Sequence, residues 1–211
     1  MQPEPNAIVR AGYDRIAATY LAVRLETFTP QEQAFLDEVV ASLEPGASVL
    51  DLGCGAGVPV TAALAAQAAV TGVDISWEQL ALARERVPSA RLVQADMASL
   101  ALASSSFDAI VAFCSLVHVP RENQQEVFGR IASWLRPSGT FAALLGTGDN
   151  PEEHDPSWYG APMYWSHFDA DATLALVREA GLIVEHSRDV AGGDGEWLGV
   201  VARPAAGRMR P

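Results

Sequence analysis

Acidic side chains end three successive apolar segments of this sequence, and a glycine-rich loop lies beside the first of them. In VLDLGCGAGVPV, Asp51 comes two residues before the loop at 53–57. Asp74 ends AVTGVD, and Asp96 ends ARLVQAD. Glycines let the main chain turn sharply and let a ligand approach it closely. A carboxylate beside such a loop would repel a pyrophosphate, but it would attract the ammonium group of an amino-acid ligand.

The segments around these acids predict how they are positioned. Apolar runs of strand length alternate with segments in which apolar residues recur at helical spacing. This alternation is typical of βαβ units, which form a parallel sheet with helices on both faces. The predicted strands span 47–52, 69–74, 90–96, 107–113 and 139–145, and the predicted helices span 60–69, 76–87 and 122–135. Because ligands of such sheets bind at the carboxyl ends of the strands, the three acids are expected to face one crevice.

The pattern changes after residue 145. Residues 146–168 are rich in glycine, proline and aromatic residues, and they predict a long loop. A helix over 170–182 is expected next, followed by two apolar strands joined by GGDG, which predicts a hairpin. The sequence therefore predicts an α/β fold with a doubly wound, mostly parallel seven-stranded sheet and an antiparallel C-terminal hairpin strand.

In order and spacing, these motifs resemble those of the class I S-adenosylmethionine-dependent methyltransferases. VLDLGCGAGVP resembles the first motif, GVD and QADM resemble the next two, and FDAIVAFCSLVHV resembles the fourth. LRPSGTFAALL resembles the strand that follows, so the resemblance covers residues 45–145 and the terminal hairpin. It implies a Rossmann-like fold, S-adenosyl-L-methionine as cofactor, and methyl transfer to an oxygen or nitrogen atom of a small-molecule acceptor.

The resemblance also implies which residues bind the cofactor. In that family the acid matching Asp74 accepts both ribose hydroxyls, the acid matching Asp96 meets the adenine amino group, and Met97 offers a main-chain donor to the ring. The implied cofactor-binding residues are Tyr13, Tyr20, Asp51, Gly53, Cys54, Gly55, Asp74, Ile75, Asp96, Met97 and Phe113. Taken singly, the glycine loop could be a tight connection, and each acid could cap a helix.

Methyl transfer from a sulfonium needs alignment and desolvation, and it needs a base only for an acceptor that arrives protonated. His118, at the end of the fourth motif, and His167, in MYWSHF, are the candidate catalytic residues. His118 could instead structure its turn. The candidate substrate-binding residues are Trp158, Tyr164 and Trp165, which predict an apolar wall for the acceptor or, alternatively, a local hydrophobic cluster.

The length of 211 residues predicts one domain, over residues 1–204. Residues 1–44 resemble the family's helical lid, in which Arg24 could pair with the cofactor carboxylate or be solvated. Residues 146–168 are expected to be an insertion on the acceptor side, and 205–211 a disordered tail. Two rival functions remain, a nicotinamide-dependent oxidoreductase and a non-catalytic S-adenosylmethionine-binding module. Asp51 opposes the first, as does Val58 where a dinucleotide fingerprint has its third glycine.

Composition restricts the partners that we expect. A net charge of −12 disfavours nucleic acids and anionic membranes, and no apolar run reaches the roughly 20 residues that span a bilayer. The N-terminus lacks the pattern of a signal peptide. Cys54 and Cys114 have neither a CxxC partner nor histidines at ligand spacing, so we expect free thiols, a cytoplasmic location and no metal. Oligomeric state is left open.

Overall fold

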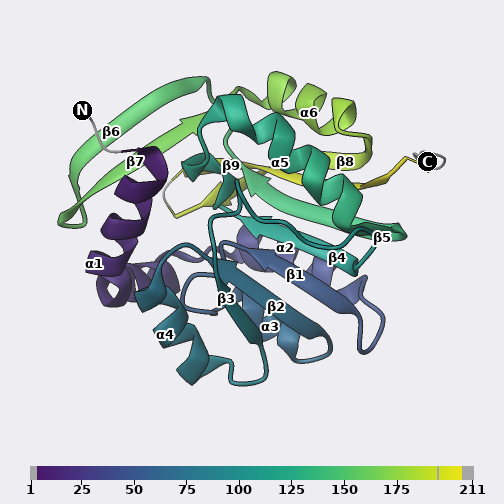
Figure 1. The fold of residues 1–211 in the computed structure, drawn as a ribbon, viewed down its shortest axis with the longest axis horizontal. Coiled ribbons are helices and arrows are strands. Elements are labelled where there is room, and N and C mark those ends of the chain that lie inside the picture. The colour runs from purple at the N-terminus through teal and green to yellow at the C-terminus, as the bar shows by residue number, and fades with distance from the viewer. Residues whose placement is uncertain (1–3, 194, 206–211) are drawn as a thin grey trace.

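The central feature of the fold is a seven-stranded sheet with helices on both faces (Figure 1). The computed structural model describes residues 4–193 and 195–205. Within them the sheet consists of β1 (Ser48–Leu52), β2 (Ala69–Asp74), β3 (Arg91–Gln94), β4 (Phe107–Phe113), β5 (Leu135–Leu145), β8 (Leu182–Gly192) and β9 (Gly195–Pro204). The strand order is β3-β2-β1-β4-β5-β9-β8. The pairs among β1 to β5 are parallel, and β9 is antiparallel to β5 and β8, which confirms the predicted fold class.

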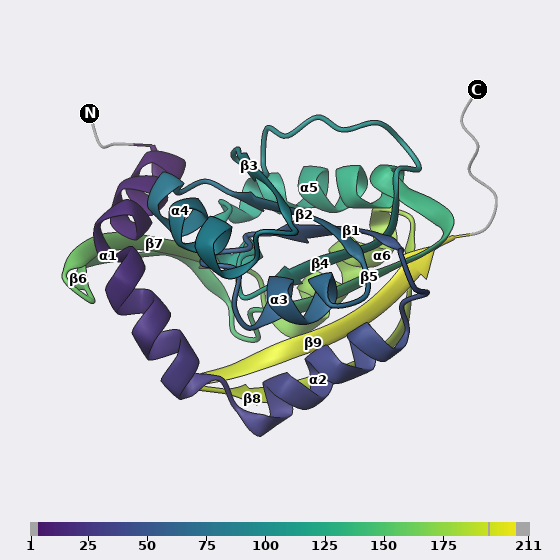
Figure 2. The ribbon, with the colours of Figure 1, turned by 90° about the horizontal axis from the view of Figure 1, so that it is seen from below.

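Two apolar cores explain why the central strands are hydrophobic on both faces. The helices are α1 (Pro5–Thr27), α2 (Pro30–Ala41), α3 (Val60–Ala65), α4 (Trp77–Arg86), α5 (Arg121–Trp134) and α6 (Ala170–Glu179), with a 3-10 turn η1 (Leu116–His118). One core lies between the sheet and α5 and α6, and the other lies between the sheet and α2 and α3. Figure 2 shows α2 and α5 on opposite sides of the sheet.

The strand order reverses beside β1, and this switch point positions the predicted acids. β1 lies between β2 and β4, and Asp51 is in register with Gly72 on one side and Val111 on the other. Ligands of open α/β sheets bind where neighbouring connections leave to opposite faces in this way. Asp74 ends β2, whereas Asp96 lies two residues beyond β3, because this edge strand stops pairing with β2 at Gln94.

The prediction of a long loop over residues 146–168 is wrong. Most of this segment forms an antiparallel pair of strands, β6 (Asn150–Trp158) and β7 (Ala161–His167), separate from the main sheet. Two of its three prolines lie in the mostly exposed β6 and the third, Pro162, is an exposed residue near the start of β7, while its apolar side chains pack against α1 in a third cluster. We call this segment the aromatic hairpin. The composition of this segment indicated a loop because its apolar partner, α1, lies near the N-terminus and leaves no signal in the segment itself.

The N-terminal region is helical, as predicted, and it holds the aromatic hairpin against the domain. α1 contacts β7, α4 and η1, and both views place it alongside the hairpin (Figures 1 and 2). The Arg24 guanidinium of α1 donates to the buried Glu32 carboxylate of α2 over 2.6 Å. Glu32 also completes the cap of α2 with Thr29. Of the predicted tail, Ala205 donates its N–H to Gly181, and residues 206–211 lie outside the described part.

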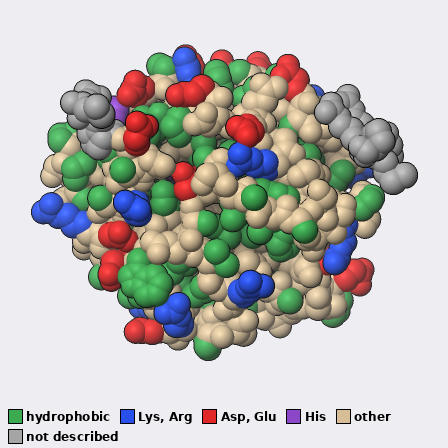
Figure 3. All heavy atoms as spheres, in the orientation of Figure 1, with side chains coloured by type: hydrophobic (Ala, Val, Ile, Leu, Met, Phe, Trp, Pro, Cys, Tyr) green, Lys and Arg blue, Asp and Glu red, His purple; other side chains and the backbone are tan. Residues whose placement is uncertain are grey.

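The distribution of surface charge and the length of the helices are the two structural features that concern possible partners. Figure 3 shows acidic and basic side chains interspersed over the face that it presents. None of the described helices combines the length and the apolar character that crossing a bilayer requires.

Candidate functional site

A cavity opens at the carboxyl ends of the parallel strands, beneath α1. This main cavity takes in ten of the predicted site residues: Tyr13, Tyr20, Gly53, Gly55, Asp74, Ile75, Asp96, Met97, Phe113 and His118. A neighbouring inner cavity contains Tyr20, Arg24, Asp51, Gly53, Cys54, Gly55, Gln79 and Phe113 among its lining residues. The two cavities therefore share the glycine loop. Among the residues of the structure that are described, no cluster of three or more His, Cys, Asp or Glu side chains could hold a metal ion.

The glycine loop has a conformation that side chains disfavour. Gly53 and Gly55 have φ angles of +79° and +53°, both in the left-handed region. A Cβ atom at Gly53 would overlap the Ser115 side chain, whereas one at Gly55 would meet only Gln79 Oε1, at 3.8 Å. At Gly53, both packing and backbone geometry require glycine. At Gly55, backbone geometry alone requires it. The loop therefore exposes bare main chain to the main cavity.

Asp74 is held rigidly at the wall of the main cavity. Its carboxylate accepts hydrogen bonds from the N–H groups of Gly55 (2.8 Å) and Ser76 (2.9 Å). Only 8% of the residue is exposed, and this burial raises its pKa to about 6, although the two main-chain donors oppose the shift. Ser76 also caps α4 by accepting from Gln79 N–H. The result is a fixed carboxylate whose free acceptor positions can receive hydroxyl groups.

Asp51 faces the inner cavity and is more deeply buried. The Thr61 hydroxyl donates to it over 2.6 Å, and 1% of the residue is exposed. Burial is the main cause that raises its pKa to about 7, with repulsion from Asp74 adding to it. Arg24 lines the same cavity while it pairs with Glu32, so it is not simply solvated. The inner cavity thus presents a carboxylate and a guanidinium to one small space.

Asp96 is another acidic residue in the lining of the main cavity. Its carboxylate accepts from Ala98 N–H (2.8 Å) and from the Asn6 amide (3.1 Å). Ile75 and Met97 add apolar side chains to the same lining. The contribution of Asn6 was not predicted, because the contact joins residues 90 positions apart and leaves no local signal.

Tyr13 and His118 form a hydrogen-bonded pair in the lining of the main cavity. Tyr13 Oη lies 2.8 Å from His118 Nε2, and His118 Nδ1 lies 2.8 Å from the carbonyl oxygen of Tyr164. A carbonyl can only accept, so Nδ1 carries a proton. Burial raises the pKa of Tyr13 well above its usual value, so the phenol stays protonated and donates to Nε2. The sequence predicted both residues but not their pairing.

The aromatic hairpin supports this pair from behind. Trp158 packs edge-on against Tyr13 with the ring centroids 5.8 Å apart, and Trp165 lies 5.9 Å from the His118 ring. Tyr164 contributes its carbonyl to His118 while its own ring packs against His154. None of the three predicted substrate-binding residues belongs to the lining of the main cavity. They therefore form a second layer behind Tyr13 and His118.

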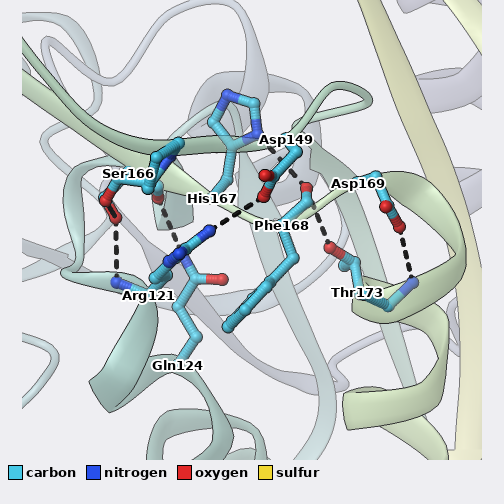
Figure 4. Close-up of polar contacts among 10 residues, drawn as sticks. Arg121, Gln124, Asp149, Ser166, His167, Phe168, Asp169 and Thr173 are labelled. Atoms are coloured by element: carbon cyan, nitrogen blue, oxygen red, sulfur yellow. Dashed lines mark hydrogen bonds and ion pairs between the residues drawn. The ribbon is translucent and has the colours of Figure 1, made fainter.

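His167 lies apart from His118. Its ring contacts the Phe168 carbonyl at 3.3 Å and occupies the space beside Gly146, outside the lining of the main cavity. Figure 4 shows the ring pointing away from Gln124 and from the Arg121–Asp149 ion pair. Regular strand alternation would put His167 on the same side of β7 as Trp165, but the register of β6 and β7 shifts between the pairs Glu153–Trp165 and Asn150–His167. The structure thus does not bring the two predicted catalytic histidines together.

Comparison with known proteins finds similarity to methyltransferases. A family described as "Methyltransferase domain" matches residues 49–139, from β1 to the beginning of β5. The trans-aconitate 2-methyltransferase of Variovorax paradoxus is 37% identical over 113 residues, which are 53% of this chain and 42% of that protein. The botryococcene C-methyltransferase of Botryococcus braunii is 35% identical over 107 residues, which are 47% of this chain and 28% of that protein.

The curated relatives are longer than this chain. The matched segments span 37%, 28% and 42% of the first three, which is less than half of each relative. Among solved structures, the DhpI-SAH complex superposes with a TM-score of 0.77 at 21% identity, covering 98% of this chain and 100% of that chain. At this identity the likeness shows a shared fold, including the C-terminal hairpin outside the family match.

Proposed function

We propose that this chain is a class I S-adenosylmethionine-dependent methyltransferase that methylates a small-molecule acceptor, since residues 49–139 match a methyltransferase domain family. One observation carries the proposal. The three acids that end successive strands line two cavities that share a glycine loop. A single ligand with an ammonium group, a ribose and an adenine would use all three. The proposed unit is residues 1–204, with 1–44 as a lid and 146–168 on the acceptor side.

The residues present fit S-adenosylmethionine. Asp74 has acceptor positions for the ribose hydroxyls, and Asp96 can accept from the adenine amino group, with Ile75 and Met97 beside the ring. In the inner cavity, Asp51 suits the ammonium group and Arg24 the carboxylate of the methionine portion. The glycine loop, including Cys54, leaves room for the ligand, and Tyr20 and Phe113 would cover it. When bound, the cofactor supplies an electrophilic methyl group.

We further propose that the acceptor atom is oxygen or nitrogen, because the site holds a route for a proton. An acceptor hydroxyl or ammonium group beside Tyr13 would give its proton to the phenol oxygen while the phenol proton moves to His118 Nε2. The proton then rests on His118, whose Nδ1–H still donates to the Tyr164 carbonyl. A carbon acceptor, as in the botryococcene enzyme's name, is the competing proposal.

The aromatic hairpin has a supporting role in this proposal. Trp158, Tyr164 and Trp165 would keep water from the Tyr13–His118 pair and hold it in place, rather than touch the acceptor. His167 has no part in the reaction as proposed, because it lies outside the main cavity. The partner is thus a small molecule that enters between α1 and the strand ends.

Isothermal titration tests the cofactor, and labelled cofactor tests the reaction. We expect S-adenosylhomocysteine to bind and NAD not to bind, since Asp51 and Asp74 oppose a pyrophosphate at the loop. Incubation of the protein with labelled S-adenosylmethionine and a metabolite extract, followed by mass spectrometry, should identify a methylated product. Binding of NAD instead would support an oxidoreductase. Binding of S-adenosylhomocysteine with no methylated product would support a non-catalytic module.

A further inference from the structure

Gln79 is a buried polar residue for which the fold provides no side-chain partner. It lies in the first turn of α4, and 1% of it is exposed. Its main-chain N–H donates to Ser76 Oγ. Among the described residues, however, neither Nε2 nor Oε1 of its amide has a hydrogen-bond partner. Buried amides are nearly always paired, so an unpaired amide needs a specific explanation.

The position of Gln79 points to a ligand. The residue lines both the main cavity and the inner cavity, which meet at the glycine loop. Its Oε1 lies 3.8 Å from where a Cβ atom of Gly55 would stand, and Gly55 is the residue whose N–H holds Asp74. The amide therefore stands where the proposed ribose site at Asp74 meets the proposed methionine site at Asp51.

We propose that Gln79 is a cofactor-positioning residue, whose amide completes its hydrogen bonds with bound S-adenosylmethionine at the junction of the two cavities. This inference rests on the proposed function. An amide suits this junction because it can both donate and accept, whereas the acids on either side can only accept when ionised. A third carboxylate there would add to the repulsion between Asp51 and Asp74. An aliphatic side chain would fill the space but leave the polar groups of the cofactor without a partner.

A second buried glutamine provides a matched comparison. Gln124, which is 3% exposed, donates from Nε2 to the carbonyl oxygens of Leu116, Val119 and Ser166. Figure 4 shows its side chain among the polar groups beside β7. The two glutamines are equally buried, but the protein satisfies only Gln124. Removing an unpaired amide should stabilise a protein, whereas removing a paired one should destabilise it.

The experiment measures melting temperature and S-adenosylhomocysteine affinity for the wild-type protein, Gln79→Met and Gln124→Met. We expect Gln79→Met to melt about 2–4 °C higher than wild type without ligand and to bind S-adenosylhomocysteine about 10-fold more weakly. Gln124→Met should melt lower and retain its affinity. Gln79→Glu, which keeps the shape but adds a charge beside two acids, should also bind more weakly, and increasingly so as pH rises.

The outcomes separate this inference from the function on which it rests. If wild-type protein fails to bind S-adenosylhomocysteine, both are overturned. If wild type binds and Gln79→Met binds equally well, only the inference is overturned. A Gln79→Met variant that melts lower or does not fold would mean that the protein itself satisfies the amide, which also overturns the inference. A higher melting temperature together with weaker binding supports it.

Discussion

The two walls of the main cavity are constructed differently. The cofactor wall consists of the glycine loop with Asp74 and Asp96, all at or just beyond the carboxyl ends of strands. The facing aromatic wall consists of Tyr13 and His118 with Trp158 and Trp165 behind them, contributed by α1, η1 and the aromatic hairpin. Main-chain N–H groups fix the acids, whereas ring packing and one long-range hydrogen bond fix the aromatic wall.

This difference separates binding from chemistry. Changes in the cofactor wall should weaken binding of S-adenosylhomocysteine, because its groups are placed to hold a ligand. Changes in the aromatic wall should lower kcat while leaving that binding nearly intact. A substitution in one wall that changes both S-adenosylhomocysteine affinity and kcat would show that the two walls act as one unit.

The largest effect is expected at the Tyr13–His118 pair. Tyr13→Phe and His118→Ala should each lower kcat by roughly 10²–10⁴-fold, the usual contribution of a positioned acid or base. S-adenosylhomocysteine affinity, measured by calorimetry, should change little. His186→Ala is the matched control, because His186 is exposed on β8 and pairs with Glu38, away from both cavities. Unchanged kcat in both variants would mean that methyl transfer proceeds by proximity alone.

The next effect concerns Asp74 in the cofactor wall. Asp74→Ala should weaken S-adenosylhomocysteine binding by about 3 kcal/mol, or roughly 100-fold, because two hydroxyl donors lose a charged acceptor. Circular dichroism should still report a folded protein, since the acid lies at a strand end. The S-adenosylhomocysteine affinity of Asp74→Asn, which keeps one acceptor oxygen, should fall between those of wild type and Asp74→Ala. Normal affinity in folded Asp74→Ala would remove Asp74 from the cofactor site.

A smaller effect is expected at Trp165, and its type is informative. Trp165 packs against His118 outside the lining, so Trp165→Ala should loosen the histidine and lower kcat about 10-fold. The KM for the acceptor should change less. Trp77→Ala is the control, because Trp77 is 49% exposed on α4. A large rise in KM with unchanged kcat would instead place Trp165 in contact with the acceptor, as the sequence alone suggested.

The two walls also differ in how far the sequence predicts them. The strands around β1, the cap at Ser76 and the placement of Asp74 follow from local patterns, because a parallel strand brings the residue after it to a fixed edge. Even there, the unpaired amide of Gln79 left no signal, since its helical position looks like any other polar residue near a helix start.

The aromatic wall could be predicted only as a set of residue types. The hydrogen bond between Tyr13 and His118 spans 105 positions, and it depends on α1 docking against η1 and β7. His167 and Trp165 are two residues apart in one strand, yet only Trp165 packs against His118. Their sequence neighbourhood is the same, and only the tertiary path of the hairpin distinguishes them.

The smallest expected effect tests the burial of Asp51, whose pKa rises from 3.8 to about 7. Because the folded protein binds this proton more tightly than the unfolded chain, the associated stability is fully present near pH 4 and is lost as pH rises through about 7. Above that pH the wild type carries a buried charge, whereas Asp51→Asn does not. The free energy of unfolding of the variant should therefore exceed that of wild type at pH 8 and approach it as pH falls to about 4.

Thermal melting without ligand measures this difference. We expect Asp51→Asn to melt about 2–4 °C above wild type at pH 8, which is less than the full pKa shift implies, because the asparagine amide is itself buried. Asp108→Asn should show the opposite sign, since Arg136 lowers the pKa of Asp108 and its charged form stabilises the fold. If Asp51→Asn melts lower than wild type at pH 8, the fold itself stabilises the Asp51 charge. If it melts higher but binds S-adenosylhomocysteine more weakly, the carboxylate is kept for the ammonium group of the cofactor at the expense of stability.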